Sequence, residues 1–183
     1  MRLLATFFML ATALLLSGCA GSLSTLDPAG PAAAAIASLW WLMFWAAVAL
    51  FLLVGVLLWA VWVRPRFGVS VTPMRWIIWG GLVMPSVLLA ALVGYALFTG
   101  ERLLPHALAE TPTRVAAHGV MWQWRFSYPD SPNAQSTPTL HIPAGEPVDV
   151  LVTSGDVIHS FWVPRLAGKI DAIPGHENIL RVH

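Results

Sequence analysis

The sequence contains a long stretch without charge, from Ile36 to Val63. A helix needs about 20 consecutive apolar residues to cross the hydrocarbon core of a bilayer, so this stretch is long enough to span a membrane. Tryptophans stand near both of its ends, where indole rings favour the membrane interfaces; they are Trp40, Trp41, Trp45, Trp59 and Trp62. The stretch therefore predicts a transmembrane helix over 36–63.

A second apolar stretch runs from Trp76 to Phe98. Pro85 and several glycines lie inside it, which a membrane helix tolerates where a neighbouring helix covers its backbone. Hydrophobic residues make up 57% of the chain and charged residues only 10%, and membrane spans account for this excess. We therefore predict a two-helix transmembrane hairpin within 36–99, with helices over about 36–63 and 76–98.

The N-terminus predicts a lipoprotein signal peptide over 1–19. Arg2 precedes an apolar run, and the string Leu16-Ser17-Gly18-Cys19 resembles a lipobox, in which Cys19 is lipidated and becomes the mature N-terminus. A plain signal peptide cut nearby and an uncleaved anchor with an incidental cysteine are the alternatives. All three readings place the chain that follows this segment outside the cytoplasm. Residues 20–35, rich in Ser, Pro and Ala, are expected to form a flexible linker.

The segment between the two spans indicates the orientation in the membrane. It carries Arg64, Arg66 and Arg75 and no acidic residue, and loops of this kind face the cytoplasm. An exported N-terminus and two crossings then place residues 100–183 on the outer, periplasmic face of a bacterial inner membrane. Since two helices are too few to enclose a polar pathway, we expect a larger membrane partner.

Residues 100–183 are more polar than the segment before them, and this change in composition predicts a separate soluble domain. All six histidines lie there, and no dense basic block occurs in a chain of net charge +1, which excludes a nucleic-acid-binding surface. Alternating and turn patterns predict strands over 114–129, on both sides of the Ala144–Pro147 turn, and over 159–164. Short strands at this spacing favour an antiparallel sandwich or barrel.

The string "VIHSFWVP" holds the most informative histidine. A period of two puts His159, Phe161 and Val163 on one face of a strand and Ser160 and Trp162 on the other. His159 thus points where apolar side chains point. A histidine in this position is either a hydrogen-bonded structural residue or a metal ligand, and the pattern alone leaves both open.

The wider string "TSGDVIHSFWVPRLAGKIDAIPGHEN" resembles the copper-domain segment of subunit II of the haem-copper respiratory oxidases, and "GVMWQWRFSYPD" resembles the aromatic segment of the same subunit. The resemblance covers the order of all segments in the chain. It implies an all-β, cupredoxin-like Greek-key domain after the hairpin. It also implies that His159 is a ligand of a dinuclear copper centre, CuA.

The other CuA ligands in that family follow later, in a loop with two cysteines, a glutamate, a histidine and a methionine. Thiolates bridging two copper ions let the centre exchange an electron with little change in geometry. This chain ends at His183, before such a loop, and Cys19 lies at the opposite end. We therefore expect that this chain alone does not complete CuA, and that it is a C-terminally truncated form with an incomplete β domain.

The resemblance assigns electron entry from cytochrome c to Trp122, with packing at an interface or in the core as the alternative. Gln123 stands where many relatives carry another aromatic residue. Acidic residues that could steer a basic cytochrome are Asp130, Asp149 and Asp171. The histidines outside the copper string are expected to be solvated or hydrogen-bonded residues; they are His106, His118, His141, His176 and His183.

The chain is therefore predicted to be subunit II of a cytochrome c oxidase, in which copper relays electrons to a haem-copper subunit I that reduces dioxygen and translocates protons. Expected partners are subunit I, subunit III, cytochrome c and the membrane. The chain alone is not catalytic. Two alternatives remain: a copper-free subunit II of a quinol oxidase, and a membrane-tethered cupredoxin or copper assembly module. No acid stands at the inner start of the second span, which argues against proton uptake through this subunit.

Overall fold

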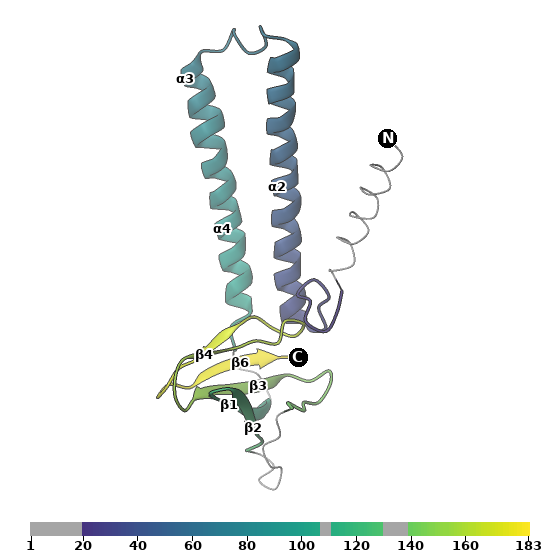
Figure 1. Cartoon of the computed structure of the whole chain (residues 1–183), viewed down its shortest axis with the longest axis vertical. Helices are drawn as coiled ribbons and strands as arrows, with labels where there is room; N and C mark the ends of the chain where they lie inside the picture. Colours follow the sequence, from purple (N-terminus) through teal and green to yellow (C-terminus); the bar gives the residue numbers. More distant parts are fainter. Residues whose placement is uncertain (1–19, 107–110, 130–138) are drawn as a thin grey trace. The chain divides into compact units, whose positions relative to one another are not determined.

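The computed structural model describes residues 20–106, 111–129 and 139–183 (Figure 1). The chain forms two compact units. One is the segment Ser38–Arg102, and the other combines the residues up to Ala37 with Leu103–His183. The predicted signal peptide and Cys19 lie outside the described residues.

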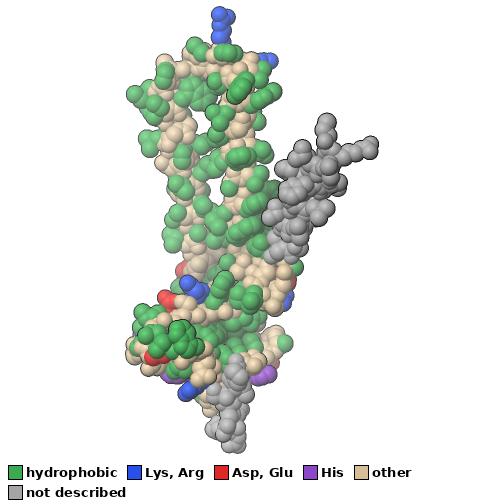
Figure 2. Space-filling model, viewed as in Figure 1, with side chains coloured by type: hydrophobic (Ala, Val, Ile, Leu, Met, Phe, Trp, Pro, Cys, Tyr) green, Lys and Arg blue, Asp and Glu red, His purple; other side chains and the backbone are tan. Residues whose placement is uncertain are grey.

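Two long apolar helices are present, as predicted. The first is α2 (Pro31–Val63), and the second is continuous through α3 (Pro73–Arg75), η2 (Trp76–Val83) and α4 (Met84–Arg102). Both are long and apolar enough to cross a membrane. Within the Ser38–Arg102 unit they run side by side in opposite directions, covered by hydrophobic side chains, and basic side chains mark the loop that joins them (Figures 1 and 2).

The second helix changes its winding where Pro85 enters it. In η2 the helix has the wider π form, and the Met84 N–H donates to the Trp79 carbonyl, five residues earlier. A proline ring clashes with the carbonyl four residues before it, and a wider turn relieves that clash. The predicted tolerance of Pro85 inside the span therefore takes the form of a local π-helix.

The remaining elements are six strands. They are β1 (Thr113–Val120), β2 (Gln123–Ser127), β3 (Val148–Ser154), β4 (His159–Phe161), β5 (Ile170–Ala172) and β6 (Asn178–Val182). A four-stranded sheet has the order β2-β1-β3-β6, and β4 and β5 form a second sheet. The prediction of two apolar helices followed by a β domain is confirmed.

Three details of the predicted β domain are wrong. The strand predicted before the Ala144–Pro147 turn is absent, since residues 139–143 form no strand, and only β3 follows that turn. The segment 114–129 is a hairpin of β1 and β2, in which Val120 pairs with Gln123 across a turn of Met121 and Trp122. Furthermore, β1 and β3 are parallel, with Ala117 opposite Val152, so the sheet is mixed and not antiparallel. Alternation of side chains indicates that a segment is extended, but it carries no information on the direction of its neighbour.

The core lies between the two sheets. From the larger sheet it takes buried valines, an alanine and a phenylalanine, and from the smaller sheet it takes Phe161 and Ala172. The contributors from the larger sheet are Val115, Ala117, Phe126, Val148, Val150, Val152 and Val182. Burying a valine side chain stabilises a fold by about 1.5–3 kcal/mol, so these residues hold the two sheets together.

The segment predicted as a flexible linker is hydrogen-bonded to the β domain. The N–H groups of Ala29 and Gly30 donate to the Arg165 carbonyl at 2.7 and 3.1 Å, and Ala33 N–H donates to the Leu166 carbonyl at 3.2 Å. The first turn of a helix lacks internal acceptors for its N–H groups, and the Leu166 carbonyl supplies one. This external cap explains why α2 begins at Pro31 and not at Ile36.

Candidate functional site

Strand β4 carries His159 at its first position. His159 is partly buried, Phe161 is buried, and Ser160 and Trp162 are exposed. The predicted alternation along this string is therefore confirmed. The imidazole of His159 belongs to the inner face of β4, next to the core residue Phe161.

Aromatic and main-chain groups surround the ring of His159. The Trp124 ring meets it edge to face with centroids 6.0 Å apart, and Trp124 also meets Phe161 in the same manner at 5.1 Å. A methyl group added at Gly119 would lie 3.0 Å from His159 Cδ2. A glycine on β1 therefore allows the close approach of this ring to the sheet.

The carboxylate of Asp156 is hydrogen-bonded to Nε2 of His159. His159 Nε2 lies 2.6 Å from Asp156 Oδ1, and the two side chains are 20% and 25% exposed. The main-chain N–H groups of Met121 and Val157 also donate to Asp156, each at 2.7 Å. These bonds lower the pKa of Asp156 from 3.8 to about 2. The hydrogen bond from His159 has the largest effect, and that from Met121 the second largest.

Sequence reasoning missed Asp156. It lies three residues before His159, a spacing at which a side chain in a turn reaches the following strand. That local signal was available in the string "SGDVIH". Its second partner, Met121, is 35 residues away in the sequence, and no local pattern could have indicated it.

Trp122 occupies the turn between β1 and β2. Its side chain is 95% exposed, the highest value among the exposed large hydrophobic side chains of the described residues. This exposure excludes the alternative of core packing. Trp124, by contrast, lies inside the domain against His159 and Phe161.

The described residues do not by themselves fit a dinuclear copper centre. Residues 20–106, 111–129 and 139–183 contain no group of three or more His, Cys, Asp and Glu side chains arranged to hold a metal ion. Within these residues His159 offers one imidazole with Nε2 already bound to Asp156. A single nitrogen ligand cannot bind two copper ions.

The acids predicted to steer a cytochrome differ in their surroundings. Asp149 is only 7% exposed and forms a salt bridge with Arg181, so its assignment as a steering residue is wrong. Asp171 is exposed and accepts a hydrogen bond from Ser160 Oγ at 2.7 Å. Asp130 lies outside the described residues.

Two of the remaining histidines are hydrogen-bonded, as expected. His118 Nδ1 lies 2.9 Å from Thr153 Oγ1 across the β1–β3 pair, and His176 Nε2 lies 3.1 Å from Asn178 Oδ1. The His141 main-chain N–H donates to the Tyr128 hydroxyl at 2.8 Å, and His141 is in no strand. None of these contacts brings a second imidazole to His159.

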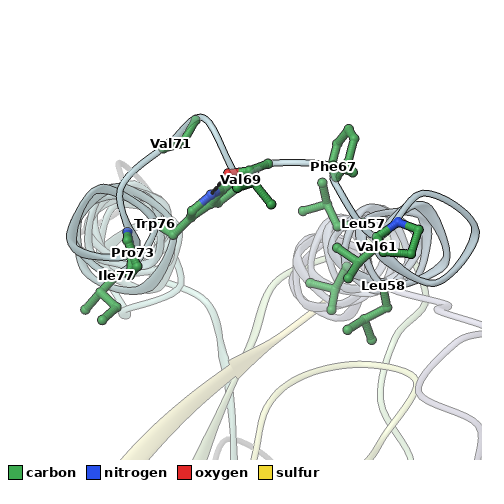
Figure 3. A pocket seen from close by; sticks show the side chains of 12 residues that line it. Leu57, Leu58, Val61, Phe67, Val69, Val71, Pro73, Trp76 and Ile77 are labelled. Carbon is green, nitrogen blue, oxygen red and sulfur yellow. Dashed lines mark hydrogen bonds between the residues drawn. The ribbon is translucent and has the colours of Figure 1, made fainter.

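A groove of about 800 Å³ lies within the helical unit, between α2 and the α3–η2 segment. Figure 3 shows Leu57, Val61 and Phe67 on one side of it and Trp76 and Ile77 on the other. Its lining side chains are apolar except for the indole N–H of Trp76, which donates to the Gly68 carbonyl. The groove therefore contains no group that could transfer a proton or bind a metal.

Comparison with known proteins shows which proteins this chain resembles. Residues 133–183 match the family described as cytochrome c oxidase subunit II, periplasmic domain. A probable cytochrome c oxidase subunit 2 of Rickettsia felis is 33% identical over 124 residues, which cover 56% of this chain and 38% of that protein. The ubiquinol oxidase subunit 2 of Acetobacter aceti is 30% identical over 192 residues, covering 94% of this chain and 59% of that protein.

Among solved structures, the periplasmic domain of subunit II of cytochrome oxidase from Bradyrhizobium japonicum aligns with a TM-score of 0.36 at 28% identity. The alignment covers 41% of this chain and 66% of that chain. The chain thus spans less than two thirds of the length of either curated relative. The sequence matches include the string around His159 and, in the Acetobacter protein, nearly the whole chain. Over 94% of its length the chain is thus similar to subunit II of a respiratory oxidase, and its C-terminal part matches the periplasmic domain of that subunit.

Proposed function

We propose that this chain is subunit II of a cytochrome c oxidase in a bacterial inner membrane, with its β domain on the periplasmic face. In this role it takes electrons from cytochrome c at Trp122 and passes them towards a haem-copper subunit I that reduces dioxygen and translocates protons. Subunit III is a further partner. Cys19 would be the lipidated N-terminus.

The observation that carries the proposal is the exposure of Trp122 on a turn that is bonded to the carboxylate holding His159. An indole that is 95% exposed can contact a protein donor directly. Tryptophan is also the residue most enriched among those that dominate protein interfaces. The arginine-rich loop of the helical unit supports the orientation, since such loops stay in the cytoplasm.

Copper enters this proposal through His159. The imidazole would supply one nitrogen ligand, and the remaining ligands would come from residues outside the described ones. Bound copper would supply one-electron redox chemistry. Within the described residues, the contribution of the chain is to orient the ring of His159 through Asp156 and Trp124.

The test uses the complete oxidase, purified with its other subunits from cells that carry the full reading frame. Oxygen consumption is measured with reduced cytochrome c and, separately, with a quinol. We expect oxidation of cytochrome c, and we expect Trp122→Phe to slow it at least tenfold. Trp162→Phe is the matched control, because Trp162 is also exposed, directly after β4, and its replacement should leave the rate within twofold.

A second candidate function is subunit II of a quinol oxidase. The observation that favours it is the match to the ubiquinol oxidase subunit 2 of Acetobacter aceti, which covers 94% of this chain and hence both helices. In that case the purified complex consumes oxygen with a quinol and not with cytochrome c, Trp122→Phe has no effect, and copper is absent from this subunit. This result would overturn the first proposal.

A further inference from the structure

The carboxylate of Asp156 lies between the turn that carries Trp122 and the ring of His159. We propose that Asp156 is a positioning residue that joins this turn to this ring, so that the proposed site of electron entry and the proposed metal ligand are held by one side chain. The functional meaning of the two joined residues rests on the proposed function. The hydrogen bonds of Asp156 to Met121 and His159 belong to the β domain and do not depend on that function.

Each oxygen of the carboxylate has its own partner. Oδ2 accepts the main-chain N–H of Met121 at 2.7 Å, and Oδ1 lies 2.6 Å from His159 Nε2. Met121 directly precedes Trp122 in the turn. Hydrogen bonds to an ionised acceptor are shorter and roughly twice as strong as neutral ones, and both distances fall in the short range. Removal of the carboxylate therefore releases both segments together.

The segment that carries Asp156 is itself fixed to the end of β1. The Gly155 N–H donates to the Gly119 carbonyl at 3.0 Å, and the Asp156 N–H donates to Ser154 Oγ at 3.3 Å. The Val157 N–H adds a third hydrogen bond to the carboxylate, at Oδ1. The main-chain N–H groups of Gly155, Asp156 and Val157 are therefore all hydrogen-bonded, and this fixes the position of the Asp156 carboxylate.

The bond to Asp156 also determines the form of the imidazole. An ionised carboxylate only accepts hydrogen bonds, so Nε2 of His159 carries the hydrogen atom. In the neutral ring the lone pair is then on Nδ1, the nitrogen that remains available to a metal ion. A carboxylate that binds a histidine ring in this way fixes its tautomer and its orientation.

The other contacts of the ring are apolar and cannot select a tautomer. Trp124 meets the ring edge to face, and the backbone of Gly119 packs against its Cδ2 side. Among the described residues, Asp156 is the only polar side chain that contacts the imidazole nitrogens. Trp124 and Gly119 therefore limit where the ring lies, and Asp156 decides which nitrogen carries the hydrogen.

The experiment compares Asp156→Ala and Asp156→Asn with the unchanged full chain in detergent micelles, by NMR. Labelling with ¹⁵N-methionine follows exchange of the Met121 amide, and labelling with ¹⁵N-histidine reads the tautomer of His159. In Asp156→Ala we expect the Met121 amide to exchange at least tenfold faster, and we expect His159 to lose its preference for hydrogen on Nε2.

Asp156→Asn keeps the shape of the side chain and serves if the alanine variant does not fold. Met121 and His159 bind different oxygens of Asp156, and in asparagine one of these two positions becomes a donor NH₂, so only one of the two bonds can be kept in the same geometry. We expect either faster exchange at Met121 or a shift of hydrogen from Nε2 to Nδ1. Asp171→Asn is the control, since Asp171 bonds Ser160 on the opposite face of β4 and should change neither signal.

These measurements need neither copper nor a cytochrome. If the oxidase uses quinol while Asp156→Ala frees the Met121 amide and the His159 ring, the proposed function is wrong and the positioning role of Asp156 is supported. If Asp156→Ala leaves both signals unchanged, the positioning role of Asp156 is wrong, whatever the electron donor.

Discussion

Arg181 of β6 lies directly opposite Asp149 of the neighbouring strand β3, and the two side chains form a pair of hydrogen bonds. Arg181 Nε donates to Oδ1 at 2.7 Å and Nη2 donates to Oδ2 at 2.9 Å, and the pair is 15% and 9% exposed. The carboxylate of Asp149 is the main cause that raises the pKa of Arg181. Arg181 also donates to the His106 carbonyl and so binds the segment that enters the β domain.

This pair leads to a prediction about stability. Asp149→Asn or Arg181→Met leaves one mostly buried charge without its partner, which should lower the free energy of unfolding of the β domain by ~2–4 kcal/mol. Urea titration of the protein in detergent measures this change. The double variant Asp149→Leu/Arg181→Met should recover at least half of the loss, because no charge then remains buried. A double variant as unstable as the sum of the single ones would contradict this account.

The titration of Asp156 provides a second prediction. Its pKa is lowered in the folded protein, so its contribution to stability is present above the ordinary value of 3.8 and is lost as the pH falls through about 2. We expect the ¹³C signal of its carboxyl group to titrate with a midpoint near 2. The His159→Ala variant should move the midpoint up towards 3.8, because the main cause of the shift is removed. A wild-type midpoint at the ordinary value would argue against the bonds of Asp156.

Gly119 leads to a third prediction. In Gly119→Ala the new methyl group would lie 3.0 Å from His159 Cδ2 and 3.2 Å from the Trp124 ring, so one of the two rings must move. Overpacking of this kind costs about 1–3 kcal/mol. We expect a loss of that size in urea titration, together with a changed NMR signal of His159. Gly100→Ala, where the methyl group meets nothing within 4 Å, is the control. Equal stability of the two variants would show that the ring is not confined.

The contact between the segment before α2 and the loop after β4 allows a fourth prediction. The ion pair of Arg165 and Asp27 is 35% and 43% exposed, so Arg165→Ala should cost at most about 1 kcal/mol. Gly30→Ala should cost more, because its methyl group would lie 2.8 Å from the His183 carbonyl oxygen and 3.1 Å from the Leu166 carbonyl oxygen, and both are main-chain atoms that side-chain rotation cannot move. Hydrogen exchange at Ala33 reports on the contact. Faster exchange in Arg165→Ala than in Gly30→Ala would reverse the expected order.

The elements with a clear local signature were predicted from the sequence. The two apolar helices follow from the absence of charge over long stretches, and the inner face of β4 follows from the alternation of His159 and Phe161 with polar or exposed neighbours. The turn at Met121 and Trp122 was missed because it contains none of the residues that usually mark a turn, such as glycine, proline or asparagine.

What the sequence could not indicate depends on residues far apart along the chain. An aspartate is usually exposed, and the burial of Asp149 is explained only by its pairing with Arg181, 32 positions later. The parallel direction of β3 next to β1 and the bond from Met121 to Asp156 are non-local in the same sense. Local patterns predict which residues face inward, but the partner that each of them meets is determined by the topology.

The π-helical turn before Pro85 has a consequence for assembly in the bilayer. Since proline has no amide hydrogen, this stretch of the second helix contains one more carbonyl acceptor than main-chain donors. An acceptor without a donor in hydrocarbon costs several kcal/mol, and a hydroxyl from an adjacent helix can offset that cost. A serine or threonine on a neighbouring membrane helix, level with Gly80 and Gly81, would supply that donor and would set how far the two helices are shifted along each other.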